Sequence, residues 1–147
     1  METTFLLVDD DKNDELFVRQ AFQSANECRL EVVYDGQEAI DYLLGKDKYS
    51  DRVTHPLPHV ILLDLKMPRV NGFEFLEWLH KDSPGDLRLT PVVVMSSSDH
   101  PRDVKLAYSL GANSYLVKPI KWSAFQERMK ALNIFWTHHV EKPFVSA

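Results

Sequence analysis

Short apolar runs and longer amphipathic stretches alternate along the chain. Five apolar runs predict β-strands over residues 5–8, 30–33, 60–63, 92–95 and 115–117. After each run, apolar residues recur at helical spacing, which predicts helices over residues 14–24, 36–44, 73–79, 101–110 and 122–139. Asp99 is expected to cap the fourth helix, with Pro101 in its first turn. Five strand–helix units predict an α/β fold, with a parallel sheet covered by helices on both faces.

The five runs differ in polarity, and the difference predicts their places in the sheet. The first, third and fourth runs are apolar throughout, as central strands of a parallel sheet should be. The second is interrupted by Glu31 and the fifth is short, so we expect these two at the sheet edges. In such sheets the functional site lies outside the carboxyl ends of the strands. The residues directly after each strand are therefore the first candidates.

Composition and charge narrow the class of protein. The chain has 147 residues, of which 44% are hydrophobic and 27% charged, and this predicts one globular domain over residues 1–147. A net charge of -5 without a basic patch argues against nucleic-acid binding. No stretch approaches the roughly 20 apolar residues that span a bilayer, so we expect no membrane contact and a cytoplasmic location. Beyond the last helix only residues 140–147 remain, so no output domain is expected.

Polar residues follow four of the five expected strands. They are Asp9, Asp10 and Asp11 after the first, Asp64 after the third, Ser96, Ser97 and Ser98 after the fourth, and Lys118 after the fifth. Carboxylates about 4 Å apart repel by roughly 4 kcal/mol per pair at an effective dielectric of about 20, so a positive group must lie among them. A hard divalent cation, Mg²⁺ ahead of Ca²⁺, suits oxygen ligands, and Lys118 supplies a second positive charge. The run at residues 9–11 could alternatively just cap the next helix.

The same groups suit phosphoryl transfer. Asp64 is the candidate nucleophile, because a strand-end carboxylate points outward and can form an acyl phosphate. The cation and Lys118 would neutralise the phosphoryl oxygens in the transition state. The Ser96 hydroxyl can donate a hydrogen bond to an anionic oxygen.

Taken together, these motifs resemble the receiver domain of two-component response regulators. The resemblance rests on Asp9 and Asp10 in LLVDDD, Asp64 in ILLDLKMP, Ser96 in VVVMSSS, and Tyr115 and Lys118 in SYLVKP. It covers about residues 4–135 and implies a doubly wound (βα)5, flavodoxin-like three-layer sandwich, similar to the chemotaxis regulator, with parallel strand order 2-1-3-4-5. The long approach to the third strand and the FW pair near the end of the chain are similar to phytochrome-associated single-domain regulators.

The resemblance implies a binding role for several residues. Asp64 would accept a phosphoryl group from the phosphohistidine of a sensor histidine kinase, in this subgroup a phytochrome-linked one. Mg²⁺, for which Mn²⁺ could substitute, would be held by Asp9 through water, by Asp10 and Asp64, and by the backbone carbonyl of Lys66. The phosphoryl group would be held by Ser96, Ser97 and Lys118.

The resemblance also implies a conformational response. Ser96 would move toward the phosphoryl group and Tyr115 would follow, which reshapes the face formed by the fourth helix, fifth strand and fifth helix. Tyr115 could instead be a packing residue. Lys66 and Ser98 would tune the lifetime of the acyl phosphate. The Lys118–Pro119 peptide bond would be cis, as in the family.

The last expected helix carries apolar residues on more than one face. Those expected to face the core are Phe125, Met129, Leu132 and Trp136, whereas Trp122, Ile134 and Phe135 lie off this stripe. Because apolar residues around a surface helix indicate a second burial partner, we expect a homodimer through this helix. The candidate contacts are Trp122, Phe125, Ile134, Phe135 and Trp136.

Other functions fit the sequence less well. A haloacid-dehalogenase-type phosphotransferase needs an acid/base Asp two residues after its nucleophile, where this chain has Lys66. Nucleotide-binding enzymes need GxGxxG or GxxxxGK[ST], and neither motif occurs. A purely structural interaction domain would not need the full set of acidic, hydroxyl and amine groups. Residues 45–58 are expected to be a surface loop or a partner contact. The best interpretation is a signalling receiver that catalyses only its own phosphorylation and dephosphorylation.

Overall fold

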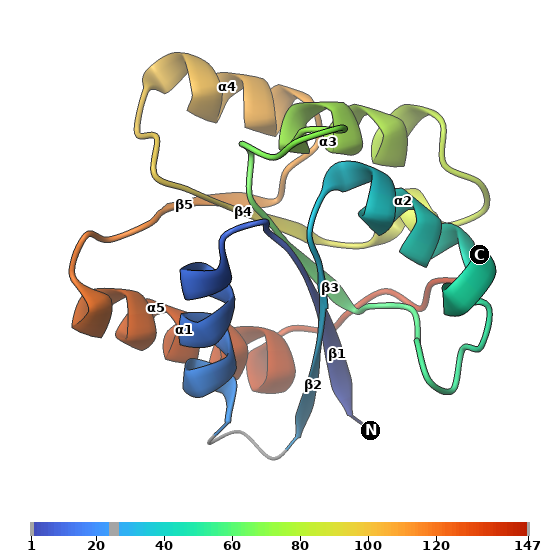
Figure 1. Ribbon diagram of the computed structural model, residues 1–147, viewed down its shortest axis with the longest axis horizontal. Helices are drawn as coiled ribbons and strands as arrows, with labels where there is room; N and C mark the ends of the chain where they lie inside the picture. Colours follow the sequence, from blue (N-terminus) through green and yellow to red (C-terminus); the bar gives the residue numbers. More distant parts are fainter. Residues whose placement is uncertain (1, 24–26, 147) are drawn as a thin grey trace.

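A five-stranded parallel sheet with helices on both faces forms the fold (Figure 1). The structure is a computed structural model and describes residues 2–23 and 27–146. The strand order is β2-β1-β3-β4-β5, and every neighbouring pair is parallel. The strands are β1 (Thr3–Val8), β2 (Cys28–Val33), β3 (Val60–Leu63), β4 (Val92–Ser96) and β5 (Ser114–Val117). The predicted fold class and strand order are confirmed.

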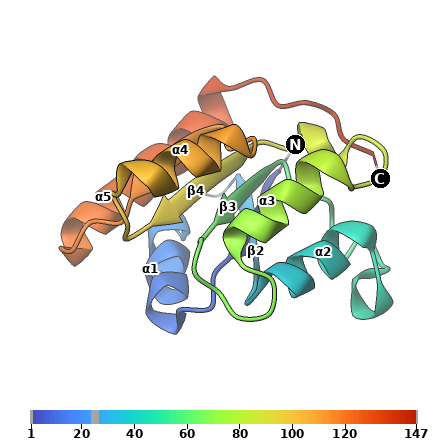
Figure 2. The same cartoon turned by 90° about the horizontal axis from the view of Figure 1, so that it is seen from above.

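Helices cover the two faces of the sheet unequally. They are α1 (Lys12–Phe22), α2 (Gly36–Leu44), α3 (Gly72–Lys81), α4 (Pro101–Ser109) and α5 (Trp122–Ile134), with short 3-10 turns η1 (Asp47–Tyr49) and η2 (Leu87–Leu89) and a π-helical turn η3 (Phe135–His139). In Figures 1 and 2, α1 and α5 lie on one face and α2, α3 and α4 on the other. Among the described residues, no helix has the length and apolar character needed to cross a membrane.

Alternating residues of the buried strands build two separate cores. On β1, Leu6 and Val8 join the core under α2 and α3, whereas Phe5 and Leu7 join the core under α1 and α5. The three central strands β1, β3 and β4 are buried along their whole length. The two edge strands, β2 and β5, are mostly half-buried. The predicted edges are therefore confirmed.

Several element boundaries differ from the prediction for local reasons. β2 begins at Cys28 because it pairs in register with β1 from Thr3 onward. α1 begins at Lys12 rather than at residue 14, because the Asp11 side chain accepts hydrogen bonds from the backbone N–H groups of residues 13 and 14. Its expected end at Ser24 lies outside the described residues. The prediction that Asp99 caps α4 is wrong. His100 is the cap, and its Nδ1 accepts from the Arg102 backbone N–H at 3.1 Å.

The long connection between α2 and β3 is packed against the domain. The Arg52 guanidinium donates to the Tyr42 and Leu43 carbonyl oxygens at 2.9 and 2.8 Å, and the Tyr42 carbonyl also accepts from the Gly45 N–H at the end of α2. The rings of Tyr42, Tyr49 and His55 lie 4.9 to 5.8 Å apart by their centroids. These contacts hold the segment against the end of α2.

Candidate functional site

A pocket of about 370 Å³ opens at the carboxyl ends of β1, β3, β4 and β5. The sheet order brings these ends together although they are far apart in the chain. The predicted site residues that line the pocket are Asp10, Asp64, Lys66, Ser96, Ser97 and Lys118. The location expected from the strand ends is thus where the structure places these side chains.

The ammonium group of Lys118 lies among three carboxylates. Its Nζ is 3.2 Å from Asp9 Oδ2, 3.3 Å from Asp64 Oδ1 and 2.5 Å from Asp14 Oδ2. The side chain of Lys118 is only 13% exposed, so these ion pairs are poorly screened by water. The sequence predicted Lys118 among the strand-end carboxylates, of which it contacts Asp9 and Asp64, but the contact with Asp14 was not predicted.

Three carboxylates form a group with the chemistry of a metal site. Asp9, Asp10 and Asp64 each offer one carboxylate oxygen, and these three oxygens lie within 4.8 Å of one another. Asp9 and Asp64 are buried, whereas Asp10 is exposed at the mouth. An all-oxygen, anionic donor set that is open to water on one side fits Mg²⁺ or Mn²⁺.

Asp64 is held at the end of β3 by backbone contacts. Its N–H donates to the Val8 carbonyl at 2.9 Å, and its Oδ1 accepts from the Leu65 N–H at 2.9 Å. Gly72 packs against this peptide so closely that a Cβ there would lie 2.4 Å from the Asp64 carbonyl oxygen. Only a glycine allows the start of α3 to approach the phosphoacceptor candidate in this way.

A salt bridge fixes the far side of the β3–α3 loop. Arg69 has a left-handed backbone (φ 63°), and its guanidinium contacts both Asp35 oxygens, at 2.8 and 3.0 Å. Nearby, the Gly36 N–H donates to the Val70 carbonyl at 2.9 Å. Burial raises the pKa of Asp35, but its hydrogen bonds from Arg69 and the Glu38 N–H outweigh this and hold that pKa below its usual value. Asp35, which follows β2, thus positions the loop from outside the pocket.

Ser96 and Tyr115 are joined through one residue. The Ser96 Oγ accepts from the Ser98 N–H at 3.1 Å, and the Tyr115 hydroxyl donates to the Ser98 carbonyl at 2.8 Å. The Ser98 hydroxyl donates to Asp103 Oδ2 on α4 at 2.6 Å. Tyr115 is half-buried and also packs against the core, so both interpretations of this residue have a structural basis.

The expected cis peptide bond at Lys118–Pro119 is wrong for this structure. The described residues contain no cis peptide bond. The trans form is intrinsically favoured for X–Pro bonds by about 0.5–1 kcal/mol. In this form the Lys118 ammonium already reaches Asp9 and Asp64.

Burial and charge shift the pKa values of the site in opposite directions. Burial raises the pKa of Asp9 from 3.8 to about 8, against the opposing effect of Lys118 and with a further increase from Asp64. Burial likewise raises the pKa of Asp64, and Lys118 opposes that shift. Burial lowers the pKa of Lys118, but the charges of Asp9, Asp64 and Asp14 outweigh it and raise that pKa above its usual value. Burial therefore disfavours the charged forms of Asp9 and Asp64 more than the Lys118 ammonium favours them.

Sequence reasoning missed residues whose contacts depend on tertiary distance. The one signal for Asp14 is the position of the helix cap. Because Asp11 caps α1, Asp14 lies in the first turn of that helix, close to the strand ends. Nothing in the local sequence links Asp35 to Arg69, which are 34 residues apart.

The chain is similar to a known protein family. Residues 5–130 match the family described as the response regulator receiver domain. Response regulator Rcp1 from Synechocystis sp. is 32% identical over 139 residues, covering 94% of this chain and 91% of that protein. The structure of its Mn²⁺-bound form superposes with a TM-score of 0.87 at 30% identity, covering 97% of this chain and 99% of the other.

Two further solved structures are similar over nearly all of the chain. The phosphorylated cyanobacterial phytochrome response regulator RcpA has a TM-score of 0.90 at 30% identity, with coverage of 98% of this chain and 100% of the other. The bacteriophytochrome response regulator RtBRR has a TM-score of 0.73 at 40% identity, with coverage of 97% and 85%.

Replacing Asp9 is expected to stabilise the metal-free protein at high pH. With the Asp9 pKa raised from 3.8 to about 8, the folded state keeps a proton that the unfolded chain has lost, so its free energy of unfolding falls as pH rises from about 4 to about 8. Asp9→Asn removes this loss, and the variant should be more stable than wild type by about 1–3 kcal/mol at pH 8, with a smaller difference at pH 5. Urea unfolding in the presence of a chelator measures both values.

Asp51→Asn is the control, because Asp51 is a fully exposed carboxylate in the connection between α2 and β3, and its pKa is lowered by hydrogen bonds with Thr54 and Val53. No gain in stability at pH 8 is expected for this variant. If Asp9→Asn were no more stable than wild type at pH 8, the cost assigned to ionising the buried Asp9 carboxyl would be absent.

Proposed function

The chain belongs to the response regulator receiver domain family, and from that premise we propose that it takes up a phosphoryl group on Asp64 with the help of Mg²⁺. The observation that carries this proposal is the position of the Lys118 ammonium, 3.3 Å from Asp64 Oδ1. The carboxylates of Asp9 and Asp10 lie close to Asp64 and could hold the cation with it. The coverage of 91% of Rcp1 and 100% of RcpA supports a single-domain regulator. We place it in the cytoplasm, where the ATP that charges histidine kinases is found.

In the proposed reaction, Asp64 attacks the phosphorus atom of a phosphohistidine. Its Oδ1 is held by the Leu65 N–H and Lys118, so Oδ2 is the oxygen that forms the new bond to phosphorus. The P–N bond breaks, and the imidazole nitrogen leaves with the electron pair. A bound Mg²⁺ supplies positive charge that offsets the carboxylates and the phosphoryl oxygens. Hydrolysis follows when a water oxygen attacks the same phosphorus and the Asp64 carboxylate leaves.

The chain's own residues hold the transferred group in place. Lys118 donates hydrogen bonds to a phosphoryl oxygen, and the hydroxyl of Ser96 and the exposed Ser97 lie at the same pocket wall. Lys66 is exposed beside Asp64, where its carbonyl can complete the metal ligands and its side chain can limit access of water. Together with Ser98, Lys66 would thereby set the lifetime of the acyl phosphate.

The output is proposed to pass through Ser96 and Tyr115. When the Ser96 hydroxyl turns to the phosphoryl group, it releases the Ser98 N–H. Because Ser98 also binds Tyr115 and Asp103, this change reaches β5 and α4 together. The face of α4, β5 and α5 is therefore the proposed surface for protein contact.

A phytochrome-linked histidine kinase is the proposed phosphodonor. The similar proteins RcpA and RtBRR are named as phytochrome and bacteriophytochrome response regulators. Their similarity extends over 97–98% of this chain, beyond the matched family region at residues 5–130. The shared C-terminal region supports a shared partner class.

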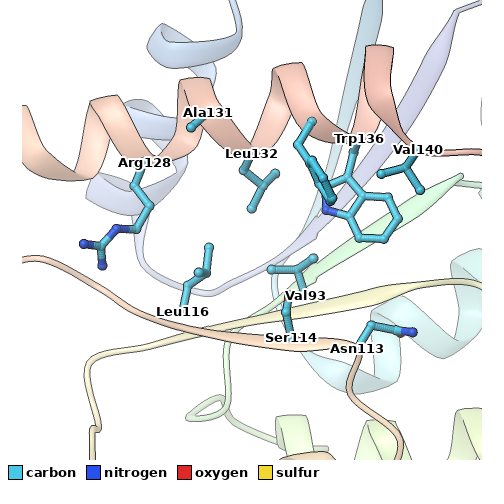
Figure 3. Close-up of a pocket in the computed structure, with 10 residues that line it drawn as sticks. Val93, Asn113, Ser114, Leu116, Arg128, Ala131, Leu132, Trp136 and Val140 are labelled. Carbon is cyan, nitrogen blue, oxygen red and sulfur yellow. The ribbon is translucent and has the colours of Figure 1, made fainter.

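A homodimer through α5 and β5 is the proposed assembly. A cavity of about 530 Å³ lies between these elements, and Figure 3 shows Leu116, Leu132 and Trp136 pointing into it. Phe135 lines the same cavity. Phe135 and Ile134 are each 52% exposed, and Trp122 is 44% exposed. A surface with both a groove and protruding apolar side chains can bind its own copy around a two-fold axis. Phe125 is 3% exposed and belongs to the core instead.

Acyl-phosphate formation on Asp64 is the first test. Incubation with Mg²⁺ and acetyl phosphate should add the mass of one phosphoryl group to the wild-type protein. Asp64→Asn should abolish this adduct, because an amide oxygen is a poor nucleophile. The charge-matched control Asp51→Asn should leave it unchanged. An adduct of equal yield on Asp64→Asn, measured by intact mass spectrometry, would contradict the assignment.

The donor class is tested by phosphotransfer. A bacteriophytochrome histidine kinase, autophosphorylated with labelled ATP, should pass its label to wild-type protein faster than a kinase from an unrelated pathway does. The same kinase should pass no label to Asp64→Asn. Equal rates from both kinases in a time course on denaturing gels would refute the phytochrome link.

The dimer is tested by one charge on the α5 surface. Wild-type protein should sediment at twice its chain mass of 17.0 kDa, and Phe135→Glu should shift it to a single chain, because burying an unpaired carboxylate at an interface is costly. Phe144→Glu is the matched control, since Phe144 is 89% exposed but lies in the C-terminal tail. Sedimentation of wild type as a single chain would rule out the assembly.

A further inference from the structure

Lys118 contacts one carboxylate that belongs neither to the candidate metal group nor to the phosphoacceptor. We propose that this residue, Asp14, is a positioning residue that keeps the Lys118 ammonium directed at Asp64 while the cation and the phosphoryl group occupy the pocket. The proposal rests on the proposed function, because it assigns a task in the same reaction.

The contact with Asp14 is the shortest of the three. Lys118 Nζ lies 2.5 Å from Asp14 Oδ2, against 3.2 Å to Asp9 and 3.3 Å to Asp64. The side chain of Asp14 is 16% exposed, so the pair is largely shielded from water. Short contacts between an ammonium and a carboxylate are the stronger class of hydrogen bond.

Asp14 lies on α1, a helix that is packed against α5. Its backbone N–H donates to the Asp11 cap at 3.2 Å in the first turn of α1. One turn further, Phe17 packs edge-on against Trp122 and Phe125 of α5, with ring centroids 5.9 and 6.0 Å apart. The Asp14 carboxylate therefore contacts Lys118 from a packed helix and not from a loop.

Cation binding changes the other two partners of Lys118 but not Asp14. Asp9 and Asp64 are members of the group whose oxygens can share one ion, and Asp14 is not. Once a divalent cation takes up their charge, Asp9 and Asp64 attract the ammonium less, and the cation itself repels it. Lys118 has a flexible four-carbon stem and directly follows the edge strand β5, so without another anchor it would turn toward water. Asp14 supplies that anchor.

The reaction gains a donor that is in place before the phosphoryl group arrives. With acetyl phosphate, an Asp64 oxygen bonds to phosphorus, the P–O bond to the acetyl group breaks, and acetate leaves with the electron pair. Lys118 keeps its protons and donates to a phosphoryl oxygen whose charge grows in the transition state. Asp14 touches none of the reacting atoms and acts only through Lys118.

The test compares two charge-removing variants in one helical turn. Asp14→Asn keeps the size of the side chain and removes its charge. Glu15→Gln is the matched control, because the Glu15 side chain is 14% exposed and also ion-paired, but with Arg19 at 3.0 Å and Lys12 at 3.8 Å. Phosphorylation by acetyl phosphate is followed at saturating Mg²⁺ and over a Mg²⁺ titration.

The maximal rate should fall about tenfold or more for Asp14→Asn and stay at the wild-type value for Glu15→Gln. The Mg²⁺ concentration for half-maximal rate should change far less than the rate itself. Asp14→Glu restores the charge and should recover most of the lost rate. A rate for Asp14→Asn at or above that of Glu15→Gln, or an equal loss in Asp14→Glu, would overturn the proposal.

A second readout does not depend on turnover. In the Mg²⁺-bound protein, the ¹⁵N-resolved NMR signal of the Lys118 ammonium should be visible in wild type and Glu15→Gln, because ion pairing slows proton exchange, and lost in Asp14→Asn. Persistence of that signal in Asp14→Asn would also overturn the proposal. If wild type gains no phosphoryl group, the proposed function fails; if wild type gains one and Asp14→Asn matches its rate, only the positioning role fails.

Discussion

Negative charge concentrated at one edge of the sheet is the constraint on which the site depends. Asp9, Asp10 and Asp64 offer oxygens within 4.8 Å of one another, and two of these residues are buried. One ammonium group lies 3.2–3.3 Å from Asp9 and Asp64, and burial of Asp9, with a smaller contribution from Asp64, still raises the Asp9 pKa above its usual value. A divalent cation held among these oxygens, as proposed above, would offset this charge before an anionic phosphoryl group arrives.

The strand order explains how Lys118 can provide the positive charge. β5 is separated from β3 by β4, so the Lys118 side chain must cross the end of β4 to reach Asp64. The residue at that crossing is Ser96, which is small, and its carbonyl accepts from the Lys118 N–H at 2.7 Å. A larger residue there would obstruct the path. The hydroxyl proposed to bind the phosphoryl group thus also leaves room for the ammonium.

Features set by short-range patterns could be predicted from the sequence, and features set by distance could not. Unbroken apolar runs located β1, β3 and β4, and the residues after them located Asp9 and Asp64. The Asp14–Lys118 pair joins residues 104 positions apart. It also depends on where α1 begins, and the Asp11 cap places that start at Lys12, two residues before the predicted start. The acidic run also has two uses at once: Asp11 caps α1, as the simpler interpretation held, while Asp9 forms an ion pair with Lys118.

The site and the proposed dimer surface share β5, which gives a change at one a direct route to the other. Lys118 directly follows Val117, the last residue of β5, and the Val117 carbonyl accepts from the Arg128 guanidinium of α5 at 2.8 Å. Arg128 also lines the cavity between α5 and β5 (Figure 3). A shift of β5 that followed Lys118 would therefore move the backbone partner of a residue that lines that cavity. Because packed elements respond by discrete repacking, such a shift would act on the proposed α5 contact surface as a whole.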